Sequence, residues 1–496
     1  MRANPELIRN VRAQLRGERM IAVAAICMVL SLVVGFSESY RFLGIDRARW
    51  GVDFLHQALW VQAMVLVLGG GFAALQAVQR EKELNTFDFQ RVTRLSPLEL
   101  TMGKLLGAPA LMYFIALCLV PAAVVGAVVG GARPPFVLAG YVILILGAVT
   151  VHAFALLLSL LVERGVATLG VILILLTLWT GPVLATGFVL NLGSLSPLVA
   201  SDITTQVSWA VDPGLAQNNV IFAPRLLIDV LFGWPVHHVY VLVVLYLVFT
   251  GWFLLAVVRN IKRDPAVYQI FTPAQSLGLA LWINLIFLGF FRWSSFAPFN
   301  AVNTFLGLNA ALFFALGLAL LRNRDTIRRL RAQSARAGGW AAALWPAPYV
   351  FGGSIVAGLV PVAIVQVIRP PDAEWNLALV LFRVAVIAVW LTRDLLFLQW
   401  MNLVRGRGRP IRQGMLYLAV FYTCAGVLVT TLHAWTSGDP AGLATAGVFL
   451  PPMVLSLSPA AWEAGWALWL AGLGIQVAVA GLFVRLQHGK LAELAP

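Results

Sequence analysis

The sequence predicts an all-α fold, a polytopic transmembrane helical bundle of about twelve spans, on three observations. The chain has 496 residues, 60% of them hydrophobic and only 11% charged, and its mean hydropathy is +0.87. So few charged side chains cannot cover the surface of a soluble protein of this length. Apolar runs long enough to cross a bilayer recur along the chain, and short arginine-rich segments separate them, as inner loops do in membrane proteins.

Charge and cysteine content exclude two other classes of protein. The net charge of +14 is concentrated in the short polar segments, so it indicates membrane topology and not nucleic-acid binding. The three cysteines lie inside apolar runs and no C-x-x-C pair is present, so we expect neither a disulfide framework nor a metal site.

The basic N-terminal arm, residues 1–20, predicts an interfacial amphipathic helix that leads into an uncleaved first span. No small-residue cleavage site follows the apolar run, which excludes a secretory signal peptide. An apolar stripe and a basic face separate on a helical wheel. The stripe consists of Leu7, Ile8, Val11 and Leu15, and the basic face of Arg9, Arg12, Arg16 and Arg19.

The first half, residues 1–265, predicts a six-span unit. Gly69-Gly70-Gly71 in the second span predicts a close helix approach or a kink. Outer segments are expected at 38–57 and at 191–238, the latter with short surface or half-inserted helices. The spans are expected at roughly 20–36, 58–78, 105–130, 136–161, 166–190 and 239–258.

The second half, residues 266–496, predicts a second six-span unit, either a degenerate repeat or an accessory bundle. Arginine-rich stretches at 322–336 and 393–412 predict inner loops. If the stretch 436–459 is itself a span, the chain has thirteen spans and not twelve; both counts stay open. The spans are expected at roughly 275–291, 300–321, 348–367, 377–392, 414–432 and 462–484.

The polar segment Arg80–Lys104, between the second and third spans, is the candidate functional element. Thr86 is placed to cap a short helix, and Ser96-Pro97-Leu98-Glu99 is typical of a second helix start. A loop that only joins two spans needs no second helix start. We therefore predict a docking surface for a partner, with an ordinary solvated loop as the alternative.

The sequence contains few candidates for catalytic or metal-binding residues. The sequence contains no Walker A, G-x-S-x-G or H-E-x-x-H motif, and its six histidines are scattered, so we expect no catalytic site and no metal. Arg383 lies inside the tenth predicted span, where a charge is costly. It either contacts an anionic head group or gating partner, or pairs with a polar group of a neighbouring span. Other intramembrane polar groups, expected to bond between helices, are His152, Asn284, Asn303, Asn309 and Gln366.

The polar segment resembles the corresponding segment of the permease subunits of type-2 ATP-binding-cassette (ABC) exporters. Those proteins carry an E-x-E-x-G-T element and, further on, S/T-P-L and G-K elements. Glu81, Glu83 and Thr86 match the first element, with Asn85 in place of its glycine. Ser96-Pro97-Leu98-Glu99 and Gly103-Lys104 match the rest.

The N-terminal arm also resembles the elbow helix of that family, and the resemblance covers residues 1–260. It implies a permease that exports a substrate and binds no cofactor itself. The many aromatic side chains, 29 Phe and 17 Trp, suit both membrane-interface belts and a path for a hydrophobic or amphipathic substrate. Energy would come from ATP through separate ABC-type ATPase subunits. It also implies the inner or plasma membrane, a cytoplasmic N-terminus and contact with membrane lipid; a homodimer is an open alternative. The implied ATPase-docking residues are Glu81, Glu83, Thr86, Arg91, Arg94, Ser96, Pro97, Glu99 and Lys104.

Two alternatives to this function stay open at the level of sequence. The first is a secondary transporter or lipid flippase that works alone; the absence of an evident chain of buried acids weakens an ion-coupled mechanism. The second is a membrane assembly scaffold, which leaves no motif.

Overall fold

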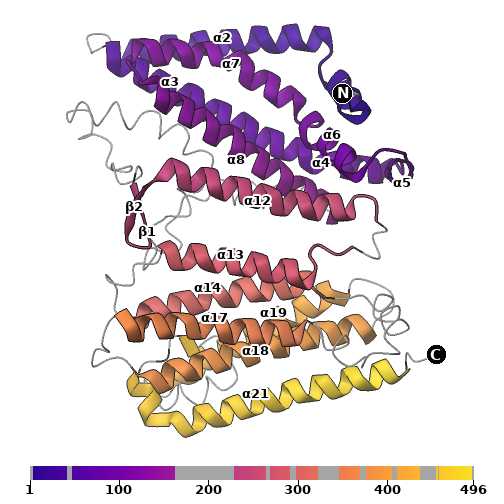
Figure 1. Cartoon of the computed structure of the whole chain (residues 1–496), viewed down its shortest axis with the longest axis vertical. Coiled ribbons are helices and arrows are strands. Elements are labelled where there is room, and N and C mark those ends of the chain that lie inside the picture. Colours follow the sequence, from indigo (N-terminus) through magenta and orange to yellow (C-terminus); the bar gives the residue numbers. More distant parts are fainter. Residues whose placement is uncertain are drawn as a thin grey trace. The chain divides into compact units, whose positions relative to one another are not determined.

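Helices dominate the part of the chain that the computed structural model describes (Figure 1). Nine of the described helices are long and apolar enough to cross a membrane, so the fold is an α-helical polytopic bundle. The count of about twelve spans stays a prediction, because the predicted fifth span at 166–190 lies outside the described residues. These are residues 4–41, 47–161, 228–263, 268–290, 298–321, 346–368, 376–404, 410–435, 454–455, 457 and 459–493.

The chain forms two compact units, and the boundary between them lies between Ile270 and Phe271. In the first unit α3 packs against α7, and α8 packs against both α4 and α12. Its elements are α1 (Pro5–Gln14), α2 (Gly17–Arg41), α3 (Arg47–Met64), the π-helix η1 (Val65–Gly69), α4 (Gly70–Glu83), α5 (Phe87–Arg91), α6 (Pro97–Gly107), α7 (Ala110–Val129), α8 (Pro134–Leu161), the strands β1 (Ile228–Leu231) and β2 (Trp234–His237), and α12 (His238–Asn260).

The second predicted span is longer than expected, because α3, η1 and α4 follow one another without a break from Arg47 to Glu83. Residues 47–57, predicted to belong to an outer polar segment, are therefore helical. The predicted close approach at the glycines is confirmed: a Cβ on Gly70 would lie 2.2 Å from His152 Nε2. His152 Nε2 donates to the Leu66 carbonyl in the π-helix (2.8 Å), and its Nδ1 accepts from the Tyr113 hydroxyl (2.9 Å). His152 thus bonds between helices, as predicted.

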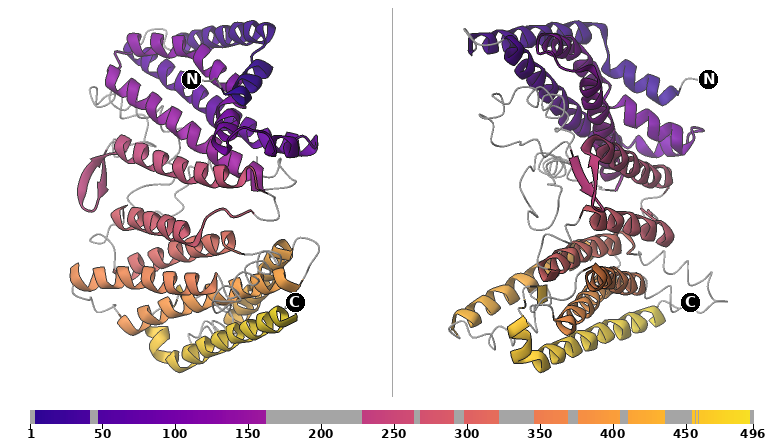
Figure 2. Two further views of the ribbon diagram at one scale, coloured as in Figure 1. Left: turned by 45° about the vertical axis from the view of Figure 1, so that its right-hand side comes forward. Right: turned by 60° about the vertical axis from the view of Figure 1, so that its left-hand side comes forward.

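Residues 228–237, at the end of the outer segment expected at 191–238, form a β-hairpin and not a surface helix; residues 191–227 lie outside the described residues. Ile228–Leu231 pairs antiparallel with Trp234–His237, and the hairpin leads directly into α12 (magenta arrows in Figure 2). Its two turn residues both have positive φ, 51° at Phe232 and 84° at Gly233, as a type I′ turn requires. Phenylalanine rarely occupies that conformation, so the sequence carries no ordinary turn signal here.

The second unit is organised around α18, which contacts α14, α17, α19 and α21. Helix α21 is kinked at Gly465, whose φ of −143° is not helical (yellow in Figure 2). The described elements are α13 (Pro273–Phe290), α14 (Pro298–Ala319), α17 (Ala347–Ile368), α18 (Leu377–Val404), α19 (Pro410–Trp435) and α21 (Pro459–Glu493).

Helix α18 corrects one sequence-based boundary. The tenth span was expected to end at residue 392, with Arg393 in an inner loop, but α18 continues to Val404 and buries both Arg393 and Asp394. The reason is local pairing: the Arg393 guanidinium forms an ion pair with the Asp394 carboxylate at 2.6 Å, so neither charge has to leave the protein. Arg383 on the same helix is also buried, and it donates to the Asn303 side chain and the Leu457 carbonyl.

Candidate functional site

The polar segment is formed by the end of α4, the short helix α5 and the start of α6. Helix α4 ends in a Schellman motif: the Thr86 amide donates to the Glu81 carbonyl (2.9 Å), and the Asn85 amide to the Lys82 carbonyl (3.2 Å). This motif requires a left-handed residue, and Asn85 supplies it with φ of 54°. Asparagine tolerates this left-handed conformation better than most residues do, so the motif forms here without a glycine.

Helix α6 starts at Ser96-Pro97, as the sequence predicts, and its first turn forms a capping box. The Glu99 amide donates to Ser96 Oγ (3.1 Å), and the Ser96 amide donates to Glu99 Oε2 (2.7 Å). Hydrogen bonds from Ser96 hold the pKa of the exposed Glu99 carboxyl below its usual value of 4.5. Thr86 stands at the N-cap position of α5, but its side chain does not cap that helix; Oγ1 donates to the Glu81 carbonyl instead (3.3 Å).

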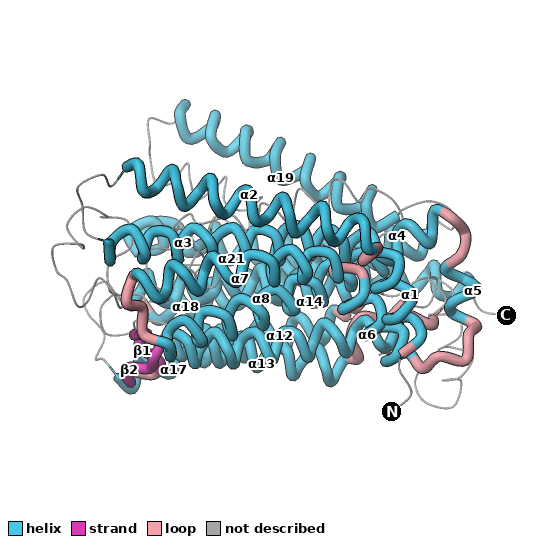
Figure 3. Tube along the Cα trace, turned by 90° about the horizontal axis from the view of Figure 1, so that it is seen from above, coloured by secondary structure: helices cyan, strands magenta, loops and turns pink. Residues whose placement is uncertain are grey.

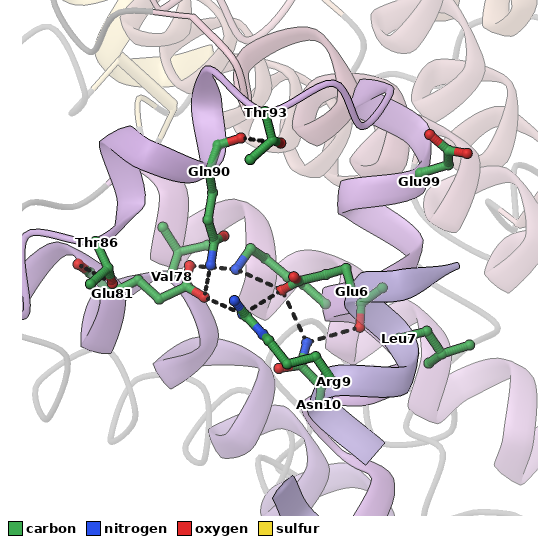
Figure 4. Close-up of polar contacts among 12 residues, drawn as sticks. Glu6, Leu7, Arg9, Asn10, Val78, Glu81, Thr86, Gln90, Thr93 and Glu99 are labelled. Atoms are coloured by element: carbon green, nitrogen blue, oxygen red, sulfur yellow. Dashed lines mark hydrogen bonds and ion pairs between the residues drawn. The ribbon is translucent and has the colours of Figure 1, made fainter. Parts of the chain in front are cut away.

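A buried ionic cluster joins α1 to the polar segment (Figure 4). We name it the docking-segment cluster; its members are Glu6, Arg9, Glu81, Gln90 and Lys104. The Lys104 ammonium, only 1% exposed, pairs with the Glu81 carboxylate and lies 3.5 Å from that of Glu6. Arg9 bridges the same two acids at 2.8 and 3.0 Å, and Gln90 donates to Glu81 (2.6 Å). Two acids and two bases make the cluster neutral.

Two glycines allow α1 to lie this close to α6. A Cβ on Gly103 would lie 2.6 Å from the Glu6 Cγ, and one on Gly107 would lie 2.7 Å from the Asn10 Cβ. Asn10 Nδ2 also donates to the Gly103 carbonyl (3.3 Å). Asn4 caps α1 and donates through Nδ2 to the Glu99 carbonyl (2.6 Å). Helix α1 therefore packs on a face of α6 that only glycine leaves open.

The segment is also attached to two membrane-spanning helices. Lys82 Nζ donates to the carbonyls of Ser159 (3.0 Å) and Leu160 (2.8 Å), the last turn of α8, where a cation is favoured. Lys262, just beyond α12, donates to the Thr93 carbonyl (2.8 Å). Hydrogen bonds therefore connect the segment to α8 and to the end of α12, and the docking-segment cluster connects it to α1.

Four large apolar side chains are exposed on this otherwise polar segment. We name them the apolar tip: Leu84, Phe89, Val92 and Leu98. Phe89 is 74% and Val92 82% exposed, whereas the neighbouring Phe87 is buried and anchors α5. Figure 3 shows α4, α5 and α6 at the end of the first unit that lies away from the β-hairpin. The tip thus consists of exposed apolar side chains on a segment that the docking-segment cluster connects to α1.

The nine predicted docking residues divide into three groups. Glu81 and Lys104 face inward, within the docking-segment cluster. Arg91 is partly buried and pairs with Asp88 (2.8 Å), and Pro97 is partly buried at the start of α6. The exposed residues, which alternate along the chain with those of the apolar tip, are Glu83, Thr86, Arg94, Ser96 and Glu99. Arg383, the tenth predicted site residue, belongs to the second unit and takes no part in this site.

Sequence reasoning missed two features of the site. It assigned the N-terminal arm to the membrane surface alone, although Glu6 is the one acid among the first 17 residues of an otherwise basic arm. It also overlooked Phe89 and Val92, whose apolar character inside a polar segment was the available signal. Among the described residues, no group of three or more His, Cys, Asp or Glu side chains could hold a metal ion.

Comparison of this chain with protein-family models, with curated proteins and with solved structures gives no match.

Proposed function

We propose that this chain is the permease subunit of an ABC exporter, and that the polar segment Arg80–Lys104 docks a separate ATPase. The chain itself would hydrolyse no ATP, and it would move a hydrophobic or amphipathic substrate. The observation that carries the proposal is the apolar tip, held on a segment that a buried ionic cluster braces. In this proposal the chain lies in the inner or plasma membrane with its N-terminus in the cytoplasm; Arg259, Lys262 and Arg263 at the end of α12 are consistent with that orientation.

Burial of the apolar tip would supply the affinity for a partner. Large apolar side chains that gather on a surface mark interaction sites, and aromatic anchors such as Phe89 are typical of the residues that dominate binding energy. The charged residues around the tip, among them Glu83, Asp88 and Arg94, would set the orientation of the partner and contribute little energy themselves.

The contacts of the segment also supply a route for mechanical work. Closure of a pair of ATPases would push on α5 and α6, and the bonds from Lys82 and Lys262 would pass the displacement to α8 and α12. Such coupling requires that the partner bind one state of the permease more tightly than the other.

The test replaces the two most exposed residues of the tip, Phe89→Ser with Val92→Ser. We expect the double variant to insert and fold normally, to lose co-purification with an ATPase from its native membrane, and to lose ATP-dependent export. The matched control is Phe232→Ser with Trp234→Ser, which removes exposed apolar side chains from the β-hairpin at the start of α12, a helix roughly 34 Å long. A wild-type chain that co-purifies with no ATPase, or a tip variant that keeps its ATPase, would overturn the proposal.

Charge variants separate docking from folding within the same segment. Glu83→Ala changes an exposed carboxylate and should weaken docking without affecting stability. Glu81→Ala instead opens the docking-segment cluster, so it should lower stability as well. The two acids match the same family element, but they have different surroundings.

One observation favours a second candidate, an ion-coupled transporter that works alone. Asp394 is a buried acid inside a long helix, which the sequence did not reveal, and intramembrane ionisable pairs often mark ion pathways. Transport by the purified chain in vesicles without ATP, driven by an imposed proton gradient and abolished by Asp394→Asn, would support this candidate over the first.

A further inference from the structure

A basic surface runs along α1 into the first turn of α2, next to the docking-segment cluster. Arg12, Arg16 and Arg19 are all exposed on it, and Glu18 is the one exposed acid beside them. Arg9, one turn earlier on α1, is 53% exposed although it pairs with two acids. The surface therefore carries a net positive charge that no described contact of these three arginines removes.

The start of α2 fixes the depth at which this surface lies in the membrane. Helix α2 begins at Gly17, and its first 19 residues form a candidate membrane span, so the junction of α1 and α2 is the point where the chain enters the bilayer. Leu7, Val11 and Leu15 on α1 are only partly buried by protein, as expected for a helix that lies on a membrane. Arg16 and Arg19 flank the entry point, and therefore lie at the depth of the lipid head groups.

We infer that the phosphates of anionic phospholipids bind Arg12, Arg16 and Arg19, and that this contact holds α1 against α6. A guanidinium matches a phosphate in both charge and geometry. The continuity of α1 with a membrane span selects lipid over a free phosphate or an acidic protein, because lipid phosphates are already present at this depth. Each arginine near an anionic bilayer surface favours binding about fivefold.

The lipid contact would also affect the polar segment, because Arg9 and Glu6 connect α1 to that segment. If α1 moves away from α6, Glu6 separates from Lys104, and Arg9 separates from Glu81. The segment then loses part of the bracing that holds α5 in place. Anionic lipid should therefore order the segment; that this ordering also favours the ATPase rests on the proposed function, whereas the lipid contact itself does not.

The first measurement is lipid selectivity of the full chain without any ATPase. Purified protein in mixed nanodiscs of phosphatidylglycerol and phosphatidylcholine is released, and the bound lipids are counted by native mass spectrometry. We expect the wild type to retain phosphatidylglycerol preferentially, and Arg12→Gln with Arg16→Gln and Arg19→Gln to reduce that preference by about 100-fold at the strongest site. The control removes three exposed arginines outside α1, namely Arg80→Gln, Arg94→Gln and Arg263→Gln, and should leave that site unchanged.

The second measurement is amide hydrogen exchange in α5 and at the start of α6. Protection should rise when phosphatidylglycerol replaces phosphatidylcholine. Arg9→Gln should abolish this response while the chain keeps its lipid preference. Equal retention of both lipids, or equal losses in the α1 variant and its control, would overturn the lipid site. If amide protection in α5 does not change with lipid composition, the proposed effect of lipid on the polar segment would be overturned. Neither measurement depends on an ATPase.

Discussion

The first unit and the second unit each bury an ion pair, but they place it differently. The docking-segment cluster joins side chains that lie far apart in the sequence, such as Glu6 and Lys104, and it sits at helix ends beside water-exposed residues. The second-unit cluster is built on α18, from the adjacent residues Arg393 and Asp394, and both are buried. Its other members are Trp390 of α18, Tyr422 of α19 and Gln476 of α21.

The two clusters differ in how easily a group from outside the protein can reach them, and this difference suits them to different roles. Arg9 is half exposed, so a lipid or a protein partner can reach the docking-segment cluster and change its geometry. In the second-unit cluster the Asp394 carboxylate accepts from Arg393, from Tyr422 (2.6 Å) and from Trp390 (2.9 Å), which leaves little room for an outside group. The first arrangement suits transmission of a signal, and the second suits a fixed contact among α18, α19 and α21.

The largest expected effect on stability comes from a change in the second-unit cluster. Asp394→Asn would leave the Arg393 charge buried without its carboxylate, and should lower the free energy of unfolding by about 3–5 kcal/mol. Denaturation by sodium dodecyl sulfate, followed by tryptophan fluorescence, would measure it. Adding Arg393→Gln removes the orphaned charge and should recover much of the loss. Full stability of the single variant would show that water reaches this cluster after all.

A smaller loss is expected from Lys104→Met in the docking-segment cluster. Glu6 and Glu81 would lose their buried cation, but Arg9 would still bridge them, so the free energy of unfolding should fall by about 2–3 kcal/mol. Lys490→Met, which breaks an exposed pair with Glu493, is the control and should change it by less than about 1 kcal/mol. The same denaturation assay applies. A Lys104 variant as stable as this control would mean that the cluster contributes nothing to folding.

Local patterns of the polar segment could be predicted from sequence because they depend on neighbouring residues. The helix start at Ser96-Pro97-Leu98-Glu99 can be recognised from a few consecutive positions, and it is confirmed. The helical membrane class follows in the same way from composition and run length. That the segment docks an ATPase stays a proposal.

Contacts between distant residues could not be predicted in this way. Nothing in the sequence pairs Glu6 with Lys104 before α1 is known to pack on Gly103 and Gly107. Arg393 was assigned to a loop because a charge normally ends an apolar run, and the assignment failed because Asp394 neutralises it within the helix. The apolar tip likewise depends on which faces of α5 and α6 remain uncovered.

A steric change at the contact of α1 with α6 should act on the docking-segment cluster and not on the second-unit cluster. Gly103→Ala places a methyl group within 2.7 Å of two Glu6 side-chain carbons, and should cost about 1–2 kcal/mol as α1 shifts. Hydrogen exchange should also quicken in α1 and α5. Gly251→Ala on α12 is the control, since a Cβ there meets nothing within 4 Å, and it should be neutral or slightly stabilising. Unchanged exchange in α1 would indicate that α6 adapts without moving it.

The smallest expected effect is the pH dependence of the exposed start of α6, at the edge of the docking segment. The pKa of Glu99 is lowered in the folded chain by hydrogen bonds from Ser96, so the carboxylate stabilises the start of α6 fully above its ordinary pKa of 4.5. This contribution is lost as the pH falls through the lower pKa of the folded state. Protection of the Ser96 amide, corrected for intrinsic exchange, should therefore decline as the pH falls from above 4.5 through the lower pKa of the folded state. Glu99→Gln can still accept from the Ser96 amide but does not titrate, so its protection should stay flat over that range. A decline of the same size in the Gln variant would assign the pH response to a group other than Glu99.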